Sequence, residues 1–127
     1  GSKSREWTVD AVKPSTAYEL SQATEVTRQA GQPAEYVFDG PFTMRLTSTD
    51  DQPGTVIGEF RVDGDGWYNY YGWPTDSTAP FLFTENGTII DSLSYGGIGK
   101  GRHTIEYRAI DAAGNYGDPQ KFIATLR

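Results

Sequence analysis

The feature that most constrains the fold is the strict alternation of apolar and polar residues in two segments. Arg102 to Ile110 and Phe42 to Thr49 both repeat with a period of two. This is the period with which successive side chains of a β-strand point to opposite faces of a sheet. Each segment therefore predicts a strand with one face in the core. Together with the next strand along the chain, they predict that the following residues are buried together: Met44, Leu46, Phe60, Val62, Ile105, Tyr107 and Ala109.

Turn-forming residues divide the rest of the chain into short segments. Asp63-Gly64-Asp65-Gly66 predicts a tight turn, and Glu85-Asn86-Gly87 predicts a hairpin that joins 81–84 to 88–93, because Asp-Gly and Asn-Gly accept the positive φ of such turns. Gly96 to Gly101 reads as a flexible connection, and residues 15–35 as strand and loop. The strands expected are 42–49, 55–63, the aromatic run 67–73, 81–84, 88–93, 102–110 and 121–126. This is an all-β, antiparallel sandwich pattern of about seven to nine strands.

Length and charge limit the organisation and the partners. The 127 residues suit one domain with one core, which we place at 15–127. Residues 1–14 combine Gly1-Ser2, which look like the remnant of a removed purification tag, with an N-terminal strand or an interdomain linker. The net charge of −6 argues against nucleic acid, and no apolar run is long enough for membrane insertion. The chain contains no cysteine, which excludes thiolate chemistry.

Two stretches carry a family resemblance. Gly40 to Asp63, with Leu46-Thr47-Ser48-Thr49-Asp50-Asp51 and then Glu59-Phe60-Arg61-Val62-Asp63, resembles the first half of bacterial immunoglobulin-like (Ig-like) repeats. Gly101 to Asn115, which contains His103-Thr104-Ile105-Glu106-Tyr107-Arg108-Ala109, is similar to their penultimate strand and turn. Such modules are appended to secreted glycoside hydrolases and surface proteins. Two parts depart from the family pattern: 72–100 is long and has its own hairpin, and 15–38 has no counterpart.

The resemblance implies an Ig-like β-sandwich that is a non-catalytic accessory module of a larger, multidomain bacterial protein, secreted or at the cell surface. It makes Trp67 and Tyr70 a structural pair, one filling the core and one capping a strand. It gives His103 a packing or hydrogen-bonding role. No nucleophile motif accompanies this single histidine, so we expect no enzyme activity.

The acidic residues of the turns are the candidates for a metal or glycosidase site. Asp63 and Asp65 form a weak Ca²⁺ candidate, since their carboxylates are separated by one glycine, but the further acidic ligands of an EF-hand are missing. An Asx turn is the simpler interpretation of every member of this set, and we expect no other cofactor. The set is Asp50, Asp51, Asp63, Asp65 and Asp111.

The aromatic run is the feature that folding explains least. Alternation cannot bury all of its rings, and exposed aromatic side chains bind sugar rings or anchor protein interfaces. Tyr68, Tyr71 and Trp73 are the candidate ligand-binding residues, with polar support from Asn69, Asp76 or Glu85. Two functions remain open at this point. One is a module that binds a polysaccharide or a protein partner, and the other is a structural spacer between neighbouring domains that has no ligand.

Overall fold

All regular structure in the described part of the chain is β-strand, in agreement with the predicted class. The computed structural model describes residues 13–49, 56–70 and 80–127. No helix in these ranges is long and apolar enough to cross a membrane. The eleven strands are β1 (Ser15–Leu20), β2 (Glu25–Thr27), β3 (Glu35–Phe38), β4 (Phe42–Thr49), β5 (Ile57–Val62), β6 (Tyr68–Asn69), β7 (Phe81–Phe83), β8 (Thr88–Ile90), β9 (Leu93–Tyr95), β10 (Gly101–Ile110) and β11 (Gln120–Leu126).

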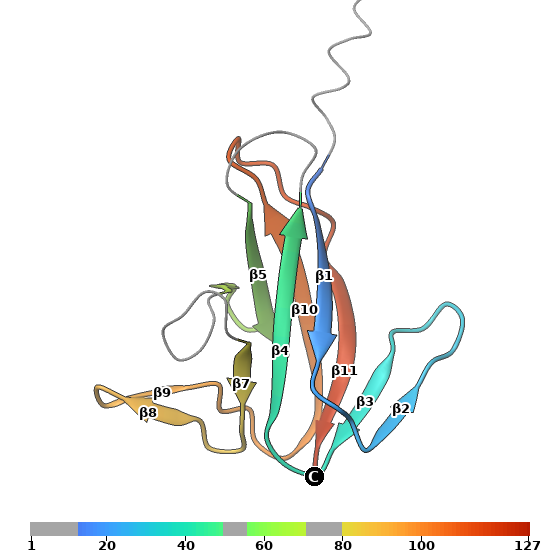
Figure 1. Ribbon diagram of the computed structural model, residues 1–127, viewed down its shortest axis with the longest axis vertical. Helices are drawn as coiled ribbons and strands as arrows, with labels where there is room; N and C mark the ends of the chain where they lie inside the picture. The colour runs from blue at the N-terminus through green and yellow to red at the C-terminus, as the bar shows by residue number, and fades with distance from the viewer. Residues whose placement is uncertain (1–12, 50–55, 71–79) are drawn as a thin grey trace, which may run out of the picture.

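The strands form two facing sheets and one separate hairpin (Figure 1). The smaller sheet has the order β1-β4-β7, and the larger has the order β2-β3-β11-β10-β5-β6. Neighbouring strands are antiparallel except β3 and β11, which run parallel. The count exceeds the predicted seven to nine because 15–38 contains β1, β2 and β3, and the expected strand 88–93 is divided by a turn into β8 and the start of β9.

The core lies between the two sheets and is largely aromatic. Phe42 of β4 stacks on Phe38 of β3 with ring centroids 4.1 Å apart, so this contact joins the smaller sheet to the larger. Phe83 of β7 also stacks on Phe42, with ring centroids 5.1 Å apart. The alternation is confirmed, because six of the seven predicted core residues are buried and Val62 is half-buried.

The predicted hairpin at Asn86-Gly87 is wrong. β7 pairs with β4, and β8 pairs with β9 across a turn at Asp91-Ser92. Both turn residues have positive φ, 52° and 71°, as a type I′ hairpin turn requires. Gly87 also has positive φ, at 83°, but its N–H donates to the hydroxyl oxygen of Thr84 at 2.7 Å. The chain therefore bends there without pairing β7 to β8, and the β8–β9 hairpin extends away from the two sheets (Figure 1).

The glycine-rich connection is hydrogen-bonded to Thr84, the residue that follows β7. The N–H of Thr84 donates to the carbonyl of Gly96 at 2.9 Å, and the N–H of Ile98 donates to the carbonyl of Thr84 at 3.0 Å. These bonds complete the outer edge of β7. Residues 15–35 fold as expected, with β1, β2 and loops.

Candidate ligand-binding surface

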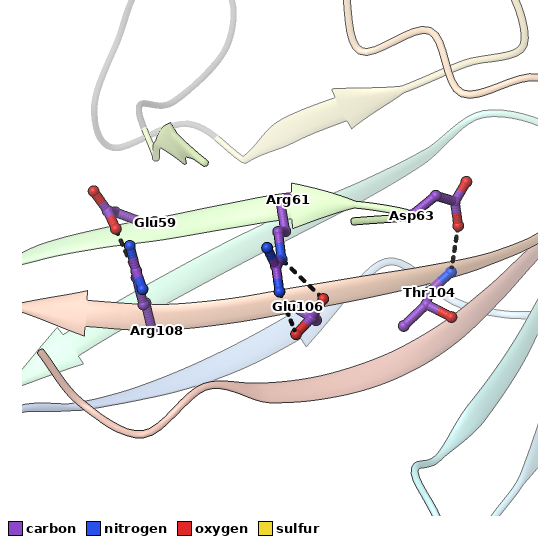
Figure 2. A network of polar contacts seen from close by, with 6 residues as sticks. All are labelled: Glu59, Arg61, Asp63, Thr104, Glu106 and Arg108. Atoms are coloured by element: carbon purple, nitrogen blue, oxygen red, sulfur yellow. Dashed lines mark hydrogen bonds and ion pairs between the residues drawn. The ribbon is translucent and has the colours of Figure 1, made fainter. Parts of the chain in front are cut away.

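The outward face of β5 and β10 carries two cross-strand ion pairs (Figure 2). Arg108 Nε donates to Glu59 Oε1 at 2.8 Å. Arg61 donates to both carboxylate oxygens of Glu106, from Nε at 2.9 Å and from Nη2 at 3.2 Å. The strand register places each pair directly opposite. Such pairs contribute about 0.2–1 kcal/mol each, so their larger effect is to hold four side chains in a fixed pattern on the sheet surface.

Trp67 lies on this outer face, next to the two arginines. The guanidinium carbon of Arg108 is 4.0 Å from the centroid of the Trp67 ring, and that of Arg61 is 4.7 Å away. Tyr116, which follows β10, approaches Arg108 as well, at 4.2 Å. Trp67 is half-buried and Tyr116 is 47% exposed. We call Trp67, Arg108 and Tyr116 the aromatic–arginine cluster.

Of the structural pair implied by the resemblance, Tyr70 is the member at the core. Tyr70 packs against the core cluster and donates its hydroxyl to the carbonyl of Met44 at 3.3 Å. Burial raises the pKa of this phenol. Trp67 is the member outside the core, because the β5–β6 register that pairs Phe60 with Tyr68 turns the preceding residue to the outer face.

Only one of the three predicted ligand-binding aromatics falls in the described part of the chain. Tyr68 on β6 is 61% exposed, and its ring is 6.2 Å from that of Phe60. Tyr71 and Trp73 lie outside the described residues, as does Asp76. Of the proposed polar support, Asn69 is exposed beside Tyr68 on β6, and Glu85 is exposed in the connection between β7 and β8.

Sequence reasoning did not identify the aromatic–arginine cluster, although a signal for it exists. The pattern Glu-x-Arg occurs on both β5 and β10. In an antiparallel pair, such a pattern can place each glutamate opposite an arginine of the other strand. Tyr116 has no sequence signal of this kind, because a loop residue is brought to the sheet face only by the fold.

His103 is bonded through both of its ring nitrogens. Nδ1 is 2.7 Å from Asp63 Oδ2, and Nε2 is 2.8 Å from the carbonyl oxygen of Gly99. The second carboxylate oxygen of Asp63 accepts the N–H of Thr104 at 2.9 Å (Figure 2). The histidine is 8% exposed, so it has the hydrogen-bonding environment expected from the resemblance. The Asx-turn interpretation of Asp63 is wrong, because its carboxylate bridges to β10.

The remaining acidic candidates form no cluster in the described ranges. Asp111 makes an Asx turn, in which Oδ1 accepts the N–H groups of Ala113 and Asn115, both at 2.9 Å. Asp65 is exposed, and Asp50 and Asp51 lie outside the described residues. Among residues 13–49, 56–70 and 80–127, no three His, Cys, Asp or Glu side chains gather in a way that suits a metal ion. Both oxygens of Asp63 already accept bonds, which weakens the Ca²⁺ candidate formed with Asp65.

Acidification is expected to destabilise the domain through Asp63. Burial opposes ionisation of this carboxyl, but the bonds from His103 and Thr104 outweigh it and hold the pKa of Asp63 below its usual range. A lowered folded-state pKa stabilises the fold above the unfolded-state pKa, and that contribution is lost as pH falls through the folded-state value. The difference in unfolding free energy between wild type and Asp63→Asn, measured with urea, should therefore be present at pH 7 and shrink as pH falls below the usual pKa of an aspartate.

The matched control for this experiment is Asp65→Asn, in the same turn but exposed. It reports what the loss of one turn carboxylate does without the bridge to β10. A difference between wild type and Asp63→Asn that stays constant from pH 7 to pH 3 would contradict the assignment.

Two hollows lie on the described part of the molecule, and the first borders the aromatic–arginine cluster at Arg108. One of about 220 Å³ is lined by the start of the described chain and by residues near Gly117 and Arg108. The other, of about 470 Å³, is lined by Asp39, Glu85, Lys100 and Arg127 among others. Neither is lined by Trp67. No protein-family profile, curated protein or solved structure matches this chain.

Proposed function

We propose that this domain is a non-catalytic, Ig-like accessory module of a larger exported bacterial protein. In this proposal it binds a polysaccharide through the aromatic–arginine cluster. The observation that carries the proposal is the position of Trp67, next to two arginines on the outer face of the larger sheet.

The strand order supports the Ig-like assignment. In immunoglobulin-type sandwiches, strands A, B and E lie in one sheet and C, F and G in the other, with C′ beside C in the variable type. The order β1-β4-β7 fits A-B-E, and the order β11-β10-β5-β6 fits G-F-C-C′. β3 then adds to the free side of the last strand, parallel to it.

The chemistry of the cluster supports a sugar ligand. A sugar ring offers an apolar face for stacking and hydroxyls for hydrogen bonds, and large aromatic side chains supply contact area at low entropic cost. Trp67 and Tyr116 supply the rings. Glu59, Arg61 and Glu106 supply donors and acceptors close by, fixed in place by their ion pairs. The two ion pairs consist of two glutamates and two arginines, so together they carry no net charge. This suits a neutral polysaccharide.

Retention on an insoluble neutral polysaccharide tests the proposal. Trp67→Ala should weaken binding by about 30-fold, since the truncation of an aromatic hot spot costs roughly 2 kcal/mol. Tyr116→Ala should have a smaller effect in the same direction. The control is Val26→Ala, which removes an exposed apolar group from β2 at the opposite edge of the larger sheet. Equal retention of Trp67→Ala and wild type, with melting temperatures unchanged, would contradict this site.

A spacer function is the second candidate, and a separate observation favours it. The start of the described chain and the C-terminus lie at opposite ends of the sandwich (Figure 1). Both ends are held to the domain: Lys13 pairs with Asp118 at 2.8 Å, and Arg127 with Asp39 at 2.8 Å. A module of this kind sets a distance between its neighbours. If wild type is retained by none of a panel of polysaccharides, the binding function fails and the spacer function is preferred.

A further inference from the structure

His103 faces two groups that accept hydrogen bonds. A carbonyl oxygen such as that of Gly99 only accepts, and an ionised carboxylate such as that of Asp63 only accepts. A neutral imidazole has one N–H, so it satisfies one of these oxygens and turns a lone pair toward the other. The two distances, 2.7 and 2.8 Å, therefore fit a ring that carries a proton on both nitrogens.

The carboxylate that this ring holds also fixes the turn before Trp67. Asp63 has a φ of 54°, in the left-handed region that disfavours a side chain. Its main-chain N–H donates to the carbonyl of Thr104 at 2.8 Å, and the turn closes with a bond from Asp65 N–H to the carbonyl of Val62 at 3.1 Å. The chain then reverses into β6, which pairs with β5 immediately after Trp67. The bridge from Asp63 to His103 thus anchors the turn from which Trp67 reaches the sheet.

We propose that His103 and Asp63 form a proton-dependent latch that positions Trp67, so that the aromatic–arginine cluster binds its ligand more tightly when His103 is doubly protonated. The regulation rests on the proposed function, whereas the latch itself rests on the geometry alone. His103 is a positioning residue here, because it acts through Asp63.

The surroundings of the ring identify what its proton interacts with. Asp63, at the end of β5, supplies the negative charge. The loop before β10 supplies the Gly99 carbonyl, and the register partner on β11 is Ala124, which is apolar. Loss of the ring proton leaves a lone pair against an oxygen in a site where the imidazole is 10% exposed, so water compensates little. The latch should therefore weaken when the ring loses its second proton.

NMR tests the latch without any ligand. The chain has a single histidine, so its ring signals need no assignment by mutation. The Trp67 indole N–H signal is assigned by its loss in Trp67→Phe. In a pH titration, the indole signal of Trp67 should shift with the same midpoint as the His103 ring. In His103→Gln, which cannot carry the charge, that shift should disappear.

A second variant keeps the test decisive if His103→Gln does not fold. Asp63→Asn retains a side-chain oxygen for the Thr104 N–H but loses the charge opposite His103, and it should also remove the pH dependence of the Trp67 signal. The proposal is overturned if the Trp67 signal stays constant while His103 titrates, or if it follows the same curve in either variant.

Binding at two pH values separates the latch from the proposed function. On a polysaccharide that retains the wild-type domain, wild type should bind about fivefold more tightly at pH 5.5 than at pH 8. This is within the usual range of coupling between two sites. His103→Gln should bind equally at both. Retention that is equal at both pH values in wild type overturns the regulation and leaves the proposed function intact. Absence of retention at either pH, with the coupled NMR titration present, overturns the proposed function and leaves the latch intact.

Discussion

Phe42→Ala is expected to destabilise the domain by about 3–5 kcal/mol, as the deletion of a buried phenylalanine ring does. The side chain is 1% exposed and stacks on Phe38 in one sheet and on Phe83 in the other. Its removal opens a cavity between the sheets that these rings cannot fill without breaking their own packing. The free energy of unfolding from urea titration measures the effect.

The control for this prediction is Ile89→Ala on the β8–β9 hairpin. Ile89 is 64% exposed, and surface substitutions of this kind stay within about 0.5 kcal/mol. A loss below about 1 kcal/mol for Phe42→Ala would show that the two sheets are not held together by this aromatic stack.

Gly96→Ala is expected to be the most damaging single-methyl change in the described chain, at roughly 3 kcal/mol or more. Two effects add at this position. Gly96 has a φ of 76°, where any side chain is strained. A Cβ built there would also meet the carbonyl oxygen of Leu82, on the strand whose edge this segment completes. The backbone of β7 or of the connection must move, and the bond from Thr84 to Gly96 is then lost.

Gly31→Ala isolates the conformational part of this cost. Gly31 has nearly the same φ, 77°, but no atom lies within 4 Å of a Cβ built there. It should cost about 1–2 kcal/mol, the usual penalty of the left-handed region. If the two variants unfold at the same urea concentration, then the close approach to Leu82 carries no energy, and the connection is as loose as its glycine content suggests.

The outcome at the glycines shows why local chemistry identified turns but not their partners. Asn86-Gly87 is a stronger hairpin signal than Asp91-Ser92, yet the hairpin forms at the second. The reason is that β7 finds a better partner in β4, where Phe83 is buried beside Phe42. The burial of two aromatic rings outweighs the preference of a two-residue turn.

The sequence also indicated only part of the candidate surface. An excess of aromatic side chains between 67 and 73 indicated that some ring must lie outside the core, and Tyr68 does. The sequence did not indicate that Trp67 would lie on Arg61 and Arg108, because the second arginine is far along the chain and meets the first only through the β5–β10 register. Tyr116 joins them from a loop.

What the sequence by itself determined is the all-β class, the faces of β4, β5 and β10, and the core that they share. Where one face of a strand must be buried, an alternation with a period of two determines which side chains face the core. Only the tertiary structure decided which strands are neighbours, where the hairpin turns, and which polar groups meet His103. Pairing depends on contacts between segments that are distant in the chain, where the burial of a few aromatic rings outweighs local turn and strand preferences. The bridge between Asp63 and His103 spans such a distance, so no local pattern encodes it.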